Sequence, residues 1–127
     1  TVKDGLREVD IDREKALSVM GDEDPYERYD SWSSTLEDFR WGSFEFAESS
    51  ESLRDRVRST LSSIVDNHPG ETVVIFSHTG VINAYLADCL GLESDLLTLP
   101  AHTGLSTVRT LGNKRAVVTI NDYSHLR

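Results

Sequence analysis

The most informative segment of the chain is residues 72–82, which read Thr-Val-Val-Ile-Phe-Ser-His-Thr-Gly-Val-Ile. Its unbroken apolar run predicts a short strand, Thr72–Phe76, buried on both faces like the strands of parallel sheets. Apolar residues then recur at helical spacing over Val81–Leu90, and Gly91 stands where a helix would end. The segment therefore predicts a strand, a tight turn and a helix, which is the repeating unit of α/β folds.

The turn between these two elements carries His78, flanked by Ser77 and Thr79. Open α/β sheets bind ligands at the carboxyl ends of their strands, and a helix amino terminus offers free N–H groups to an anion. We therefore interpret His78 as a phosphate-contacting residue. The alternative is a histidine that merely completes the last turn of the strand.

Further elements follow from apolar periodicity and from turn residues. Three more helices are predicted: Asp12–Met20, one capped at Asp24-Pro25 that runs through Tyr29–Leu36, and Ser50–Asn67. Two strands, Leu105–Leu111 and Ala116–Ile120, flank the hairpin signal Gly112-Asn113-Lys114. No repeat interrupts this order, so we expect one domain over residues 1–127.

Composition narrows the class of protein. A net charge of −9 disfavours nucleic acid and anionic membranes as partners, because phosphate backbones require clustered Lys and Arg. No apolar run is long enough for a membrane span and no secretory signal is present, so we expect a cytoplasmic protein. The histidines lie far apart, which disfavours a metal site. The single cysteine, Cys89, is interpreted as a small buried apolar residue.

Most of the acidic residues precede Ser52, where seven aromatic residues also lie: Tyr26, Tyr29, Trp32, Phe39, Trp41, Phe44 and Phe46. Charge runs are usually solvated surface, and Trp and Phe are usually buried. We therefore expect most of the acids of residues 10–52 to face solvent and the aromatic side chains to pack inward. Contact of the aromatics with a substrate is the alternative.

Several short motifs occur in the order found in one known family. Ser77-His-Thr-Gly-Val-Ile82 resembles the Ser-His-Gly-Gly-Val-Ile segment of the histidine phosphatase superfamily, which includes the cofactor-dependent phosphoglycerate mutases. Four further segments resemble that family's other elements: Leu6-Arg7-Glu8; Ala47-Glu48-Ser49 with Leu53 and Arg56-Val57; His102 to Ser106; and Asn121-Asp122-Tyr123-Ser124-His125-Leu126. Together they cover most of the chain.

The resemblance implies a three-layer αβα fold with a mostly parallel sheet, and phosphoryl transfer through a phosphohistidine without metal or cofactor. It assigns His78 to the transferring phosphoryl group and Glu8 to protonation of the leaving oxygen. Ser77, Thr79 and His102 would line the phosphate site. Residues 10–52 would form a helical cap that governs substrate choice. Glu8 as a plain surface glutamate, and His102 as a donor to a neighbouring carbonyl, remain alternatives.

The family's phosphoacceptor lies in an Arg-His-Gly tripeptide, but no arginine precedes any of the four histidines here. We therefore interpret the chain as the carboxyl-terminal two-thirds of such a protein, without its nucleophile. Within the matching part, Asp10 to Glu14 replace the family's Gly-x-Trp-x-Gly, and Thr79 replaces a glycine. The first change puts the shape of the substrate entrance in doubt.

The expected partner is a small phosphorylated substrate. A phosphatase is favoured over a mutase, because mutases carry longer insertions and a His-Gly-Asn element where this chain has His78-Thr79-Gly80. A non-catalytic phosphate- or protein-binding relic is the other alternative. The family's nucleophile-bearing strand would lie beside Thr72–Phe76, so the chain alone is expected to form homo-oligomers, swap strands or stay loosely packed.

Overall fold

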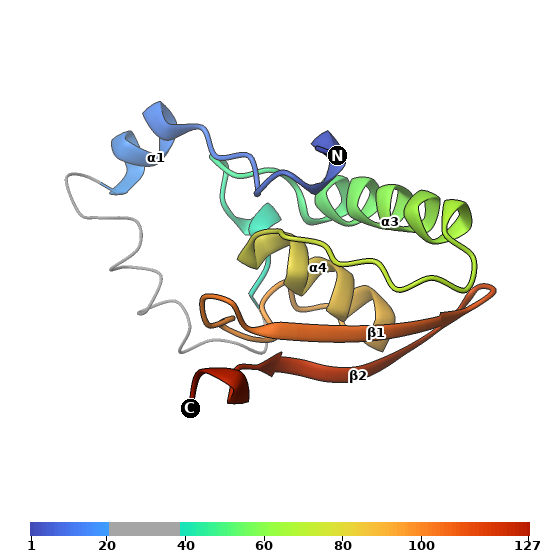
Figure 1. Ribbon diagram of the computed structural model, residues 1–127. Helices are drawn as coiled ribbons and strands as arrows, with labels where there is room; N and C mark the ends of the chain where they lie inside the picture. The colour runs from blue at the N-terminus through green and yellow to red at the C-terminus, as the bar shows by residue number, and fades with distance from the viewer. Residues whose placement is uncertain (21–38) are drawn as a thin grey trace.

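The computed structural model describes residues 1–20 and 39–127. The chain forms these elements in order: η1 Asp4–Leu6, α1 Arg13–Met20, η3 Trp41–Ser43, α3 Ser50–Asn67, α4 Thr79–Leu90, β1 Leu105–Leu111, β2 Lys114–Asp122 and η4 Ser124–Leu126 (Figure 1). The predicted helix through Tyr29–Leu36 lies outside the described residues. Within them, no helix is both long and apolar enough to cross a membrane.

Helix α3 has the bounds that its sequence predicts. Ser49 caps its amino terminus, where the Ser49 Oγ accepts the backbone N–H of Ser52 at 3.1 Å. Its apolar stripe, formed by Leu53, Val57 and Leu61, is buried. The predicted helix Asp12–Met20 is confirmed as α1, which begins one residue later.

Helix α4 begins at Thr79, two residues before its predicted start, with His78 as its N-cap residue. It ends at Gly91, whose φ of 67° is the left-handed conformation that glycine adopts without a Cβ clash. The early start places the backbone N–H groups of Thr79 and Gly80 in the first turn of the helix. His78 therefore lies directly at a helix amino terminus.

The hydrophobic core lies between α3 and α4, which pack side by side (Figure 1). Its buried members come from five segments: Leu6, Val9, Phe39, Trp41, Leu53, Val57, Leu61, Val81, Ala84 and Leu96. Phe39, Trp41 and Phe46 are buried and Phe44 is half-buried, so inward packing is confirmed for the described part of the aromatic set. Tyr26, Tyr29 and Trp32 lie outside the described residues. Cys89 is only half-buried, and burial raises the pKa of its thiol.

The described part of the chain contains one sheet, the antiparallel hairpin of β1 and β2. Both predicted strands are confirmed, and Gly112 in the turn between them has a φ of 59°. The predicted mostly parallel sheet is not found in these residues. The physical reason is that β1 and β2 follow each other through a tight turn, which joins only antiparallel strands.

The predicted strand Thr72–Phe76 is wrong for this chain as it stands. Residues 71–78 run extended but pair with no other strand in the described residues. The side chains of Val74 and Phe76 are 71% and 95% exposed, so burial on both faces is wrong as well. A strand exists only through hydrogen bonds to a neighbour, and residues 1–20 and 39–127 supply none beside this segment.

Candidate active site

Glu8 lies at the amino terminus of α4, although it comes from the opposite end of the chain. Its Oε1 accepts the backbone N–H of Gly80 at 3.1 Å and that of Val9 at 2.9 Å. A carboxylate at this position is stabilised by the free N–H groups and the positive end of the helix dipole. The fold thus brings the Glu8 carboxylate to Gly80, which lies two residues after His78.

The His78 side chain is exposed at the start of α4 and makes no capping hydrogen bond. Its backbone carbonyl accepts the first helical hydrogen bond, from the Ile82 N–H at 2.9 Å. The imidazole therefore lies outside the hydrophobic core, beside the half-buried Thr79. An exposed imidazole next to helix N–H groups can contact an anion without displacing any packed side chain.

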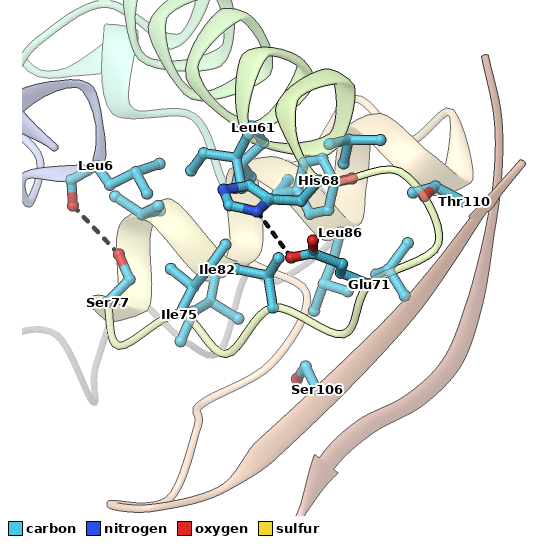
Figure 2. Close-up of a pocket in the computed structure, with 16 residues that line it drawn as sticks. Leu6, Leu61, His68, Glu71, Ile75, Ser77, Ile82, Leu86, Ser106 and Thr110 are labelled. Atoms are coloured by element: carbon cyan, nitrogen blue, oxygen red, sulfur yellow. Dashed lines mark hydrogen bonds and ion pairs between the residues drawn. The ribbon is translucent and has the colours of Figure 1, made fainter. Parts of the chain in front are cut away.

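Ser77 binds the backbone near the start of the chain. Its Oγ donates to the Leu6 carbonyl at 3.2 Å, and the residue lines a cavity of about 240 Å³ with mainly apolar walls (Figure 2). Neither His78 nor Glu8 lines that cavity. Ser77 therefore ties the extended segment to the turn that carries Glu8, in addition to its predicted role at the phosphate site.

His102 is exposed in a turn that follows Ala101, and two asparagines bind the backbone of residues 97–101 before it. Asn83 of α4 accepts the N–H groups of Leu97 and Thr98 at 2.7 and 2.8 Å. Asn121 accepts the Ala101 N–H at 2.8 Å. In the described residues no hydrogen bond or ion pair joins His102 to His78 or Glu8.

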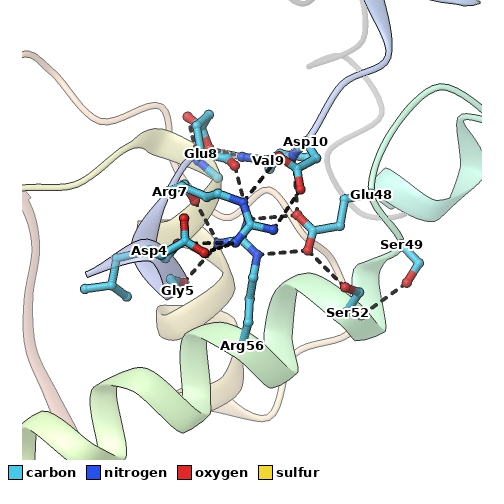
Figure 3. A network of polar contacts seen from close by, with 12 residues as sticks. Asp4, Gly5, Arg7, Glu8, Val9, Asp10, Glu48, Ser49, Ser52 and Arg56 are labelled. Carbon is cyan, nitrogen blue, oxygen red and sulfur yellow. Dashed lines mark hydrogen bonds and ion pairs between the residues drawn. The ribbon is translucent and has the colours of Figure 1, made fainter. Parts of the chain in front are cut away.

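An ion pair between Arg56 of α3 and Glu48 supports the turn that carries Glu8 (Figure 3). The Arg56 Nε and Nη2 donate to the two carboxylate oxygens at 2.8 and 2.7 Å. Burial by itself would raise the pKa of Glu48, but hydrogen bonds from Arg56, Ser52 and the Asp10 N–H outweigh it and lower that pKa. Glu48 is therefore a buried, ionised anchor.

Comparison with known proteins assigns the chain to a family. The model of the histidine phosphatase superfamily (branch 1) matches residues 1–123. The chain belongs to the histidine phosphatase superfamily. One similar solved structure is Bacillus stearothermophilus YhfR, with a TM-score of 0.70 and 21% sequence identity, covering 98% of this chain and 62% of that one. No curated protein matches.

At this level of identity the likeness to YhfR shows the fold alone. This member of the histidine phosphatase superfamily spans less than two thirds of the length of YhfR. The sequence analysis named Glu48 and Arg56 as parts of the family pattern but assigned neither a role. Their spacing of eight residues gave no signal, because only side chains three or four residues apart are neighbours on a helix, and Glu48 precedes the Ser49 cap.

Among residues 1–20 and 39–127, no three His, Cys, Asp or Glu side chains are grouped as metal ligands would be. A further ion-pair cluster joins Asp88 of α4 to Arg58 and Arg115 at 2.6 Å each. Hydrogen bonds from Arg58 outweigh burial and lower the pKa of Asp88. That cluster ties α4 to α3 and to β2, away from His78.

The Glu48–Arg56 pair predicts a measurable pH dependence of stability. Because the folded-state pKa of Glu48 lies below its ordinary value of 4.5, the stabilisation is fully present above that value and is lost as pH falls through the folded pKa. We expect Glu48→Gln to lower the free energy of unfolding by about 3 kcal/mol at pH 7, the scale for breaking a buried pair. The difference from wild type should shrink at low pH.

Urea unfolding followed by tryptophan fluorescence, at pH 7 and at stepwise lower pH, measures this difference. Glu51→Gln is the matched control, because Glu51 lies three residues after Glu48, in the first turn of α3, but its side chain is 75% exposed. Exposed pairs contribute about 1 kcal/mol or less. Equal losses in the two variants, or a Glu48→Gln deficit that does not change with pH, would contradict the assigned role of the pair.

Proposed function

We propose that this chain is the carboxyl-terminal part of a phosphomonoester hydrolase that works through a phosphohistidine. The observation that carries the proposal is the Glu8 carboxylate at the amino terminus of α4, two residues from an exposed His78. The start of α4 therefore offers two functions. The Glu8 carboxyl group can donate a proton, and the His78 imidazole and the helix N–H groups can stabilise an anion. Cleavage of a phosphate ester requires both a proton donor for the leaving oxygen and stabilisation of the negative charge on the phosphoryl oxygens.

In the proposed first step, a histidine nitrogen of the upstream Arg-His-Gly segment attacks phosphorus. The N–P bond forms, the P–O bond to the alcohol breaks, and Glu8 gives its proton to the leaving oxygen. His78 and the Thr79 N–H stabilise the charge on the equatorial oxygens, with Ser77 and His102 as further phosphate contacts. In the second step water attacks phosphorus, Glu8 takes a proton from it, and the N–P bond breaks to free phosphate and histidine.

The cavity beside Ser77 supports a place for the missing strand. Alternate residues of two extended segments line it: Val73, Ile75 and Ser77 on one side, and Ser106, Val108 and Thr110 of β1 on the other (Figure 2). Successive side chains of a strand point to opposite faces, so each segment turns one face toward the same space. In the described residues, the edge of β1 that faces away from β2 carries unpaired backbone N–H and C=O groups. The backbone of residues 72–76 is unpaired as well.

We propose that the upstream nucleophile-bearing strand lies between these two segments. It would pair with both free edges and place its inward side chains over α3 and α4, whose Leu61, Ile64, Ile82 and Leu86 form the floor of the cavity. It would also turn residues 72–76 into a true central strand and so complete the mostly parallel sheet of the αβα fold. The residues of 10–52 would then form the cap over the substrate.

The test is an assay of the complete protein, including the sequence upstream of Thr1, against a panel of phosphate monoesters with and without EDTA. We expect release of inorganic phosphate that EDTA does not abolish. Transfer of the phosphoryl group between acceptors without release would favour the mutase alternative. Binding of esters without turnover, in a folded protein, would overturn the proposal in favour of a non-catalytic relic.

A further inference from the structure

The turn that carries Glu8 is held from one side by a single side chain. The Arg56 Nη1 donates to the carbonyls of Gly5 and Arg7 at 2.9 and 2.8 Å, and its Nη2 donates to the carbonyl of Glu8 at 3.1 Å (Figure 3). One guanidinium thus binds three carbonyls within four residues. The planar fork of arginine can do this, whereas the ammonium of lysine is a single point charge.

Arg56 is itself fixed in this orientation. Its Nε and Nη2 also donate to Glu48, and the two side chains are only 14% and 6% exposed. Glu48 in turn accepts from the Ser52 hydroxyl at 3.0 Å, within the first turn of α3. The guanidinium is therefore held between a carboxylate fixed to the helix on one side and the Glu8 turn on the other.

Two glycines let the turn that carries Glu8 lie close against α3 and α4. A Cβ added at Gly80 would overlap the Glu8 Oε1 and the Val9 Cγ2, and a Cβ added at Gly5 would overlap the hydroxyl of Thr60 on α3. Both glycines permit close approach of the turn to a helix. The backbone of Glu8 is thus held to α3 and its carboxylate to α4.

We infer that Arg56 is a positioning residue, which sets the point at which the Glu8 carboxylate meets the start of α4. The inference rests on the proposed role of Glu8 as proton donor. Arg56 touches neither His78 nor the phosphate position, and it acts through the three carbonyls it binds. Its loss lets the turn move away from α4 and takes the carboxylate out of reach of the leaving oxygen.

The kinetic test compares two substrates of the complete enzyme. Nitrophenolate leaves without needing a proton, whereas the alkoxide of glycerol phosphate does need one. We expect Arg56→Lys to lower kcat for glycerol phosphate by about 10²-fold, within the range of general acid catalysis, with little change in KM. For p-nitrophenyl phosphate the loss should be only a few-fold. Arg58→Lys, on the same helix but paired with Asp88, is the matched control.

Gly80→Ala provides a second variant that displaces Glu8 while leaving Arg56 intact, and the same selective loss is expected. If Arg56→Lys fails to fold, the Gly80→Ala result decides. Equal losses on both substrates in either folded variant would overturn the inference, because a general structural defect does not discriminate between leaving groups.

A structural readout separates this inference from the proposed function. In the NMR spectrum of the complete protein, the amide proton of Gly80 should lie downfield because it donates to the Glu8 carboxylate, and Glu8→Ala should abolish that downfield shift. Arg56→Lys should remove most of it, and Arg58→Lys should retain it. If the wild type hydrolyses no ester, the proposed function fails, but the Gly80 signal still decides whether Arg56 positions Glu8. A full downfield shift of the Gly80 amide in Arg56→Lys would overturn the inference.

Discussion

In the complete enzyme, His78→Ala is expected to lower turnover by about 10³-fold, the upper end of the loss of about 10²–10³-fold found when one donor to a developing anion is removed. Stability should change little. The His78 side chain is exposed and makes no capping hydrogen bond, and substitutions at such positions usually stay within about 0.5 kcal/mol.

Single-turnover assays with a phosphate monoester, together with urea unfolding, measure both parts of this expectation. His125→Ala is the control, because His125 is exposed near the carboxyl terminus and contacts Thr103 at 3.4 Å rather than α4. Near-normal turnover in a folded His78→Ala protein would refute the role of His78. A large loss of stability would show that the side chain is structural.

Residues 1–127 alone are expected to show no phosphatase activity and to self-associate. Nucleophilic catalysis needs a phosphoacceptor, and the family motif that would supply it does not occur in this chain. The extended segment 72–76 offers unpaired N–H and C=O groups together with exposed Val74 and Phe76. Unpaired edges with apolar side chains recruit strands from other molecules.

Light scattering during size-exclusion chromatography measures the association. Phe76→Lys should weaken it, because lysine on an edge opposes strand pairing. Leu17→Lys on α1 is the matched control, since Leu17 is also exposed but lies on a helix. A compact monomer that unfolds cooperatively would contradict the proposed place of the missing strand.

The elements that could be predicted from sequence are those with complete local signals. Helix α3 has its cap at Ser49 and its apolar stripe within its own bounds, and the hairpin has its turn residues between its strands. Thr72–Phe76 has an equally clear apolar pattern, but a strand also needs a hydrogen-bonding neighbour, which local sequence does not specify. Its prediction therefore failed where those of α3 and the hairpin succeeded.

The candidate site also contains one part that local sequence predicts and one part that it does not. The strand–histidine–helix order placed His78 at the start of α4 correctly, whereas Glu8 was proposed only from the family resemblance. No periodicity shows that the Glu8 carboxylate accepts the Gly80 N–H, or that Arg56 binds three carbonyls of the same turn. Those contacts arise when segments distant in sequence pack together, and only the fold displays them.

The most direct test of a phosphohistidine mechanism is to trap the intermediate in the complete protein. Glu8→Gln should be phosphorylated by p-nitrophenyl phosphate, whose leaving group needs no proton, but should lose the phosphoryl group slowly because water is not activated. We expect acid-labile, base-stable phosphate on a histidine upstream of Thr1, and none on His68, His78, His102 or His125. Absence of acid-labile phosphate in both wild type and Glu8→Gln, or label on any of these four histidines, would contradict the account.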